Sequence, residues 1–269
     1  MTANSQSSVG SDGPCAEQRV PGLGPPHFAA ARHVSVNEGY KLWAPCYDRD
    51  PNPLLALEER ELLPLLPSSA GRDVVDVACG TGRWLVKLLG SGARSAVGVD
   101  VSGAMIEVAR TKLPPELSLK GHLVRADSTA LPLRSESADL VVCSFAVGHF
   151  GDLVSSVREL ARVARPGAGV FVTDLHPGGY ARGWRTGFRL PGVSAPIEIE
   201  AFSYSTEQLR AAFVCQGLEV VRFLEARLGE PERAVFARAA KSHLFESACQ
   251  VPAVLICQLR RLSSFARTA

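Results

Sequence analysis

Short apolar runs alternate with segments of helical periodicity along most of this chain, and the alternation predicts its fold. The apolar runs are typical of buried parallel strands and cover residues 73–77, 95–100, 121–125, 139–145, 169–174, 218–224 and 253–259. The segments with a helical pattern cover residues 54–66, 82–89, 102–112, 153–164 and 205–215. This order indicates a doubly wound α/β fold, in which a mostly parallel sheet carries helices on both faces.

Two helix starts carry specific capping signals. Asn52 stands before Pro53, and asparagine is a good N-cap while proline is tolerated at the first helical position. Ser205 and Gln208 have the spacing of a capping box, in which each side chain bonds the other residue's backbone N–H. Both signals support the helices expected at 54–66 and 205–215.

Changes in composition divide the chain into a tail, a domain and an insertion. Residues 1–35 are rich in Ser, Gly, Pro and Ala, and we expect a flexible tail there. One domain follows over 36–262, with an N-terminal cap at 36–70. Residues 175–204 hold several arginines, and they contain too many glycines and prolines for a long helix. Because this insertion follows a strand, we expect it to act as a lid over a pocket.

The turn after the first core strand is the strongest chemical signal. Asp76 ends an apolar run, Gly80 and Gly82 follow, and Asp100 ends the next apolar run. Glycines at a helix start let a ligand approach the backbone, and an acid at the end of the second strand suits a ribose diol. A dinucleotide fingerprint needs a glycine where Leu85 stands, and Asp76 would repel phosphate but suit an ammonium group.

Five ordered motifs extend this signal. They are Asp76-x-Ala78-x-Gly80-x-Gly82, Gly98-x-Asp100-x-Ser102-x-x-Met105, Ala126-Asp127-x-x-x-Leu131-Pro132, Ala138-Asp139-Leu140-Val141-Val142, and residues 159–167. In these motifs the chain resembles the class I S-adenosylmethionine-dependent methyltransferases, in particular the type 11 group. The resemblance implies a seven-stranded, Rossmann-like sheet whose seventh strand is antiparallel, with S-adenosylmethionine as the cofactor. A catalytically silent cofactor-binding module and, more distantly, a nicotinamide oxidoreductase remain alternatives.

The resemblance also implies roles for residues around the cofactor. The backbone of Ala78, Cys79 and Gly80, with Gly82, would lie along the methionyl and ribose groups, Asp76 would face the ammonium, and Asp100 would hold the ribose hydroxyls. Three groups of residues complete the implied site: Val101, Met105, Asp127 and Ser128 around the adenine, Ser144 and Phe145 beside the methionyl group, and Tyr40, Trp43 and Tyr47 over the cofactor. Tyr47 and Phe145 would also contact the substrate.

Methyl transfer depends mainly on alignment, and the need for a base depends on the acceptor. His149 and His176 follow the fourth and fifth strands, so we consider both as candidate bases. Arg182 in the insertion could grip an acidic group, because guanidinium matches carboxylates. The overall plan resembles methyltransferases that esterify malonyl-acyl carrier protein. A quinol, a phenol or a secondary metabolite, methylated on carbon or oxygen, is the alternative acceptor.

Composition narrows the possible partners. The chain has 269 residues and a net charge of +2 with both signs interspersed, so a nucleic-acid partner is not expected. No apolar run is long enough for a membrane span and no signal peptide is evident. The seven cysteines are scattered and lack zinc-site spacing, which is typical of reduced thiols in a cytoplasmic protein without a metal. A small-molecule or carrier-bound substrate is therefore expected.

Overall fold

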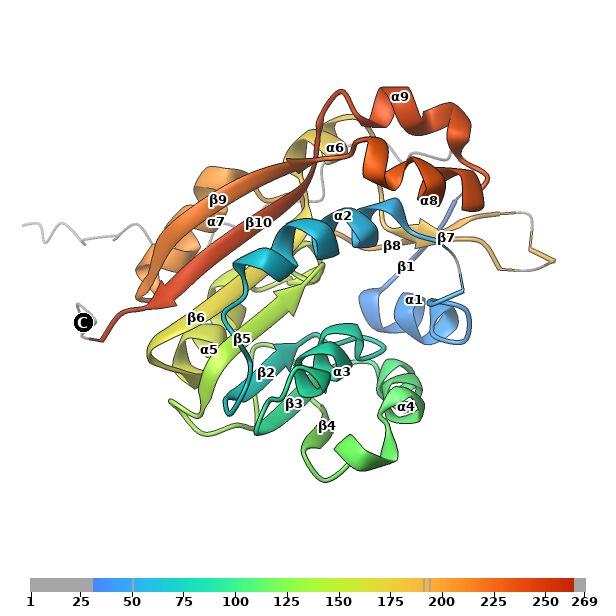
Figure 1. Ribbon diagram of the computed structural model, residues 1–269. Coiled ribbons are helices and arrows are strands. Elements are labelled where there is room, and N and C mark those ends of the chain that lie inside the picture. Colours follow the sequence, from blue (N-terminus) through green and yellow to red (C-terminus); the bar gives the residue numbers. More distant parts are fainter. Residues whose placement is uncertain (1–30, 50, 191, 194, 264–269) are drawn as a thin grey trace, which may run out of the picture.

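A seven-stranded sheet forms the centre of the described part of the molecule, in the order β4-β3-β2-β5-β6-β10-β9 (Figure 1). The computed structural model describes residues 31–49, 51–190, 192–193 and 195–263. The strands are β2 (Asp73–Val77), β3 (Ser95–Asp100), β4 (Gly121–Arg125), β5 (Ala138–Ser144), β6 (Ala164–Leu175), β9 (Leu218–Arg227) and β10 (Pro252–Arg261). β10 is antiparallel to both β6 and β9, whereas the pairs among β2 to β6 are parallel. The predicted doubly wound α/β sheet is confirmed.

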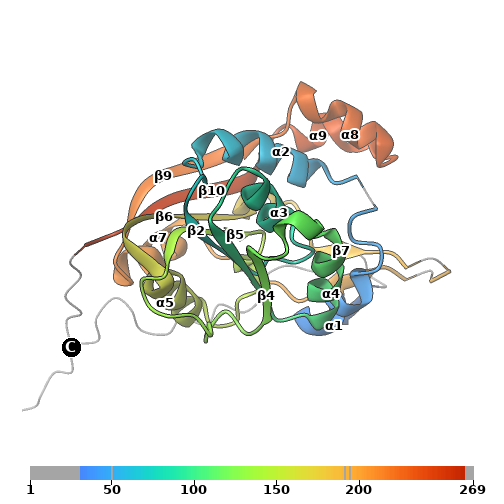
Figure 2. The ribbon, with the colours of Figure 1, turned by 60° about the horizontal axis from the view of Figure 1, so that its bottom comes forward.

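Helices cover both faces of this sheet. They are α2 (Pro53–Leu62), α3 (Arg83–Gly90), α4 (Gly103–Lys112), α5 (Leu153–Val163) and α7 (Thr206–Cys215). α2 and α3 lie on one face, and α5 and α7 lie on the other (Figures 1 and 2). Two short helices, α8 (Arg233–Arg238) and α9 (Phe245–Ala248), lie between β9 and β10 in the chain and pack on the α2 side.

The two-residue period of the strands produces one core on each face. Along β5, Leu140 and Val142 pack with α2 and α3, whereas Val141 and Cys143 pack with α5 and α7. On β2, Val74 joins the first of these cores. Because both faces are apolar, the strands read as continuous apolar runs in the sequence.

The predicted caps are present at both helix starts. Asn52 Oδ1 accepts a hydrogen bond from Leu54 N at 2.9 Å. Ser205 and Gln208 form the reciprocal capping box at 3.3 and 2.9 Å. The helix expected at 54–66 is shorter than predicted: α2 ends at Leu62, and residues Leu63–Leu65 form a 3-10 turn that contains Pro64, which has no N–H to donate.

A second, three-stranded sheet joins the N-terminal segment to the insertion after β6. β1 (Arg32–Val34) pairs in parallel with β8 (Ile197–Ile199), which pairs with β7 (Gly187–Phe188). Helix α1 (Val36–Trp43) follows β1, and α6 (Pro177–Ala181) opens the insertion. β1, β7, β8 and α1 lie together beyond the carboxyl ends of the central strands, whereas α6 lies beside β10 (Figure 1).

The expected tail is thus corrected at its end. Residues 32–34 form β1, because the insertion supplies a partner strand that the local composition cannot reveal. The remaining tail prediction, for residues 1–30, lies outside the described residues.

The structure bears on two further expectations, that the cysteines are reduced and that no segment spans a membrane. The free thiols among the described residues are Cys46, Cys79, Cys143, Cys249 and Cys257. Cys215 is disulfide-bonded, so the expectation of reduced thiols is wrong at that position. Among the helices that the structure describes, none has the length and apolar character needed to cross a membrane.

Packing of α1 on β8 depends on the absence of a side chain at Gly39. A Cβ at Gly39 would lie 2.6 Å from Ile199 Cγ1, closer than real Cβ contacts, and 3.1 Å from Val34 Cγ2, which is tighter than most. We predict that Gly39→Ala lowers the free energy of unfolding by about 1–3 kcal/mol, the usual cost of overpacking a core. Chemical denaturation measures the change. Ile199→Ala should restore part of the loss in Gly39→Ala, and Gly90→Ala, where a Cβ meets no atom within 4 Å, is the control. Equal stability of the two glycine variants would contradict the prediction.

Candidate functional site

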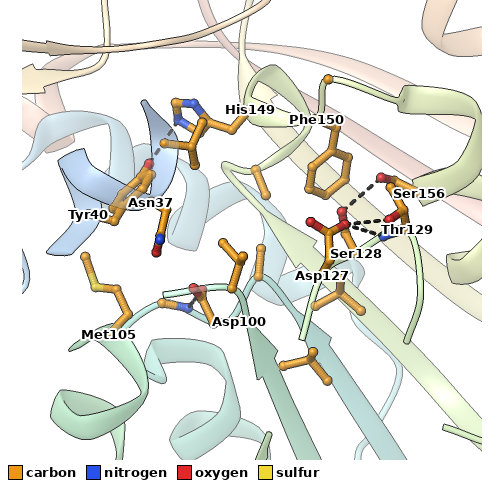
Figure 3. A pocket seen from close by; sticks show the side chains of 18 of the residues that line it. Asn37, Tyr40, Asp100, Met105, Asp127, Ser128, Thr129, His149, Phe150 and Ser156 are labelled. Carbon is orange, nitrogen blue, oxygen red and sulfur yellow. Dashed lines mark hydrogen bonds between the residues drawn. The ribbon is translucent and has the colours of Figure 1, made fainter. Parts of the chain in front are cut away.

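A cavity of about 480 Å³ opens at the carboxyl ends of β2, β3 and β5, beneath α1 (Figure 3). Its volume falls in the range of about 300–1,000 Å³ that is typical of small-molecule sites. The predicted site residues that line it are Tyr40, Tyr47, Ala78, Gly80, Asp100, Val101, Met105, Asp127, Ser128, Ser144, Phe145 and His149. The structure therefore brings together residues from segments more than a hundred positions apart.

The turn after β2 presents its backbone to the cavity. Ala78, Gly80 and Gly82 have positive φ angles of 55°, 54° and 79°. A Cβ at Gly80 would meet no atom within 4 Å, because this residue faces open space. A Cβ at Gly82 would instead lie 3.1 Å from Ala109 Cβ of α4, so this glycine permits close packing of α3 on α4. Cys79, the remaining predicted residue of the turn, is buried with its sulfur toward Gly98 and does not line the cavity.

Asp100 is held in place by backbone donors. Its Oδ2 accepts from Gly80 N and its Oδ1 accepts from Ser102 N, both at 2.8 Å. Burial raises the pKa of this carboxyl above its ordinary value, and the two backbone bonds oppose that shift. Each oxygen keeps a second lone-pair position, so Asp100 can accept hydrogen bonds from a pair of ligand hydroxyls.

Asp76 lies behind the turn rather than in the cavity wall. It is buried, and its Oδ2 accepts a hydrogen bond from Leu85 N at 3.0 Å. Burial raises the pKa of Asp76 to about 7. Asp76 Oδ2 accepts from an N–H in the first turn of α3, where an acid is favoured. The contact of this carboxylate with a ligand ammonium group stays a prediction.

The far end of the cavity carries a second polar cluster (Figure 3). Asp127 Oδ1 accepts from Thr129 N at 2.8 Å and from Thr129 Oγ1 at 2.7 Å. Ser128 Oγ lies 2.9 Å from Ser156 Oγ of α5. The apolar wall at this cavity includes Met105 from α4, which is itself buried. The cavity thus combines apolar surface with polar groups at two places.

Tyr40 and His149 form a hydrogen-bonded pair that faces the cavity (Figure 3). His149 Nδ1 lies 2.8 Å from the Glu200 carbonyl oxygen, and Nε2 lies 3.0 Å from the Tyr40 hydroxyl. A carbonyl only accepts, so Nδ1 carries the proton and Nε2 accepts from the hydroxyl when the ring is neutral. Burial lowers the pKa of His149, which favours this neutral form. Burial also raises the pKa of Tyr40.

Aromatic rings stand behind this pair. Trp43 stacks on Tyr40 with ring centroids 6.0 Å apart and on Phe188 of β7 at 4.8 Å. Tyr47 meets Trp43 edge-on at 4.8 Å. Tyr40 and Tyr47 line the cavity, whereas Trp43 forms the layer behind them and joins the N-terminal segment to the insertion.

The segment after α1 is also tied to the glycine turn. Asp48 Oδ1 accepts from Thr81 Oγ1 at 2.9 Å, and Asp48 Oδ2 pairs with Lys112 Nζ at 2.5 Å. Lys112 Nζ also donates to Thr81 Oγ1 at 2.8 Å. The N-terminal segment is therefore connected to the glycine turn and α4 through Asp48, and to His149 through Tyr40.

The sequence did not indicate the buried carboxylate of Glu58, which lies beside the cavity. Glu58 of α2 is fully buried, and its Oε1 accepts from Ser144 Oγ and Thr173 Oγ1, both at 2.6 Å. Arg83 and Trp84 of α3 also donate to it. Glu58 reads in the sequence as one of several charged positions of α2, so no local signal marks it.

Two predicted residues lie away from this cavity. His176 is the N-cap of α6: its Nδ1 accepts from Gly178 N at 2.9 Å, and its Nε2 lies 3.4 Å from Glu225 Oε1. Arg182 is exposed at the end of the same helix. Neither lines the cavity, and their roles at the acceptor stay predictions. The insertion turns after α6 and instead brings Glu200 to the cavity wall.

The charge of the cavity wall has one sign. Among the described residues that line it are four acids and neither lysine nor arginine; the acids are Asp100, Asp127, Asp152 and Glu200. Sequence analysis also missed lining residues from the N-terminal segment, the β5–α5 loop and α5, namely Ser35, Val36, Asn37, Phe150, Gly151 and Ser156. These residues carry no motif, and only tertiary packing brings them to the site.

The first half of the central domain matches a family model described as a methyltransferase domain, over residues 74–167. The chain is 31% identical over 110 residues to a demethylmenaquinone methyltransferase of Lactococcus lactis, covering 40% of this chain and 44% of that protein. It is 34% identical over 116 residues to an O-methyltransferase of Pyrenophora dematioidea, covering 43% of each chain. The chain thus spans less than half the length of these two relatives.

Similarity of fold extends further along the chain. The crystal structure of an S-adenosylmethionine dependent methyltransferase from Mesorhizobium loti superposes with a TM-score of 0.63 at 20% identity, covering 78% of this chain and all of that one. In this chain, the seven-stranded sheet and its antiparallel strand β10 are those that the resemblance implied. Residues 74–167 therefore match a methyltransferase domain, and the fold of the described chain is that of the S-adenosylmethionine dependent methyltransferases.

Proposed function

We propose that this chain transfers a methyl group from S-adenosylmethionine to an uncharged small molecule, with the hydroxyl of a quinol or phenol as the favoured acceptor class. The observation that carries the proposal is one cavity that holds both Asp100 with the glycine turn and the Tyr40–His149 pair. When bound, the cofactor supplies a methyl group already activated by its sulfonium.

The residues present fit this cofactor. Asp100 offers two carboxylate oxygens for the ribose hydroxyls, and the open face of Gly80 admits a ligand against the backbone. Asp127 and Ser128 lie at the other polar end for the adenine, and Val101 and Met105 supply apolar surface. Tyr40 and Tyr47 present aromatic faces to a cation and exclude water.

The charge of the wall favours an uncharged acceptor. Four acids without a lysine or arginine would repel an anionic substrate. Arg182, which would have gripped a carboxylate, is exposed and away from the cavity. Esterification of a malonyl group on a carrier protein is therefore the less supported alternative. The name of the first relative, a demethylmenaquinone methyltransferase, supports an uncharged acceptor, and the name of the second, an O-methyltransferase, supports transfer to oxygen.

Tyr40 and His149 can remove the proton of such an acceptor. The neutral ring holds Nε2 as an acceptor, and the Tyr40 hydroxyl donates to it. An acceptor hydroxyl that donates to Tyr40 would pass its proton along this bond to His149. The chain's own contribution to the transfer is then alignment, exclusion of water and this proton path.

The N-terminal segment and the insertion would act together as the cover of this site. They share the sheet formed by β1, β8 and β7, so we propose that residues 36–70 and 175–204 form one cap of the methyltransferase domain. Asp48, bonded to Thr81 and Lys112, and Tyr40, bonded to His149, hold the cap against the domain.

Cofactor placement is tested by removal of the Asp100 carboxylate. We expect Asp100→Ala to weaken S-adenosylhomocysteine binding by about 2 kcal/mol, or about 30-fold, because charge-assisted hydrogen bonds to the ribose are lost. Isothermal titration measures the affinity. Glu107→Gln is the control, since Glu107 is an exposed acid on α4. Unchanged affinity in Asp100→Ala would refute the placement, and binding without any methyl transfer would favour the silent module.

Acceptor class is tested by charge. A methyl-transfer screen with labelled cofactor should compare a menaquinol analogue, a simple phenol and a malonyl thioester. We expect label in the uncharged hydroxyl compounds and little in the malonyl compound, because the acidic wall opposes its carboxylate. Preferential labelling of the malonyl compound would overturn the proposed acceptor class while leaving the cofactor placement intact.

The proton path predicts a specific pH dependence. The neutral form of His149 is the active one, so kcat should rise with pH and then level off. Burial lowers the pKa of His149, which places the midpoint below the ordinary value of about 6.5. His149→Asn should remove this rise, and both His149→Asn and Tyr40→Phe should lower kcat by about 10²–10⁴-fold. His176→Asn is the matched control, because His176 lies away from the cavity. A midpoint unchanged in His149→Asn would exclude His149 as the base.

A further inference from the structure

The buried Glu58 and the half-buried Arg83 form an ion pair behind the cavity wall. Glu58 is fully buried, and Arg83, the first residue of α3, donates to it through Nη2. The same Nη2 lies 3.2 Å from Ser144 Oγ, and Ser144 lines the cavity at the end of β5. The guanidinium of Arg83 therefore contacts a residue of the cavity wall.

Arg83 keeps a donor that the pair does not use. Within the described residues, Nη1 is buried and has no hydrogen-bond acceptor. The nearest ion-pair partner of this atom, Glu59 Oε2, is 3.7 Å away, and Glu59 Oε1 is bonded to Lys87 at 2.6 Å. A buried donor without a partner costs free energy, which an incoming acceptor would recover.

The hydrogen bonds of Ser144 determine which end of a zwitterionic ligand it can bind. Its hydroxyl proton is directed to Glu58 at 2.6 Å, so toward the cavity Ser144 can only accept. An ammonium group suits that acceptor, whereas a carboxylate needs a donor. The lining residues that the structure describes include no lysine or arginine.

Arg125 and Arg83 do not line the cavity but donate hydrogen bonds to residues that do. Arg125 donates to the Val101 carbonyl oxygen beyond β3, on the side of Asp100 and α4. Arg83 lies at the glycine turn and β5, next to Ser144 and Tyr47. Arg83 is thus the cation at the end of the cavity where the methionyl group of the cofactor would lie under the proposed function.

We infer that Arg83 binds the carboxylate of the cofactor's methionyl group and that Glu58 positions the guanidinium for this contact. The inference rests on the proposed function, since it assigns one end of the same ligand. It adds a role for two residues of α2 and α3 that none of the motifs marks.

Equilibrium binding of two ligands tests the carboxylate contact without an acceptor. The ligands are S-adenosylhomocysteine and its decarboxylated analogue, which keeps the adenosine and the amine. We expect the wild-type protein to prefer the carboxylate-bearing ligand by about 10–100-fold, the range of a charge-assisted hydrogen bond. In Arg83→Met this preference should disappear, with the affinity for the analogue nearly unchanged. Arg83→Lys should retain part of the preference.

Controls separate a binding role from a structural one. Lys87→Met removes a cation from the same helix that pairs with α2 but does not contact a lining residue, and it should keep the wild-type preference. Arg83→Met leaves Glu58 buried and unpaired, which threatens folding, so Arg83→Met/Glu58→Gln removes both charges. The preference is a ratio within one preparation and is independent of the folded fraction. Glu58→Gln alone should reduce the preference partially.

The outcomes distinguish this inference from the proposed function. A preference that persists in Arg83→Met or in the double variant overturns the carboxylate contact, as does an equal loss of both ligands or a wild-type protein that binds both equally. A wild-type protein that binds neither ligand refutes the cofactor site itself.

Discussion

The reversal of strand order between β2 and β5 is the constraint on which the site depends. The chain builds outward from β2 through β3 to β4 and then returns to place β5 on the other side of β2. At such a point the loops after the two strands run in opposite directions and leave a crevice. The glycine turn follows β2, Ser144 ends β5, and Asp100 ends β3, so all three reach the same crevice.

Closure of the crevice depends on two segments that are distant in sequence. β1 and β8 pair in parallel, and Gly39 lets α1 approach β8 closely. Through this contact the Tyr40 hydroxyl reaches His149, while the Glu200 carbonyl fixes the proton of the same ring on Nδ1. One packing arrangement therefore covers the cavity and also sets the tautomer of the proposed base.

Negatively charged groups line the cavity, and a positively charged group lies behind its wall. Carboxylates line the wall, where Asp100 is held by backbone N–H groups and Asp127 by its own turn. The guanidinium of Arg83 stands behind the wall and is held by Glu58. An acidic wall with a recessed cation suits a ligand that carries positive charge at its centre and one carboxylate at its end, as S-adenosylmethionine does, and it disfavours an anionic acceptor.

The sequence by itself determined the sheet and the side of the cavity formed by the glycine turn and Asp100, because both depend on local features. Continuous apolar runs indicate strands that are buried on both faces, and Gly80, Gly82 and Asp100 lie within one strand–helix–strand unit. Most of the residues proposed from these motifs line the cavity. Only the tertiary structure decided where Asp76 and His176 point, because each bonds a nearby backbone N–H that competes with a ligand. It also decided that Glu58, Arg83 and Glu200 stand at the site. These residues meet it through contacts across 25 to 115 positions of the chain, and no local pattern encodes such contacts.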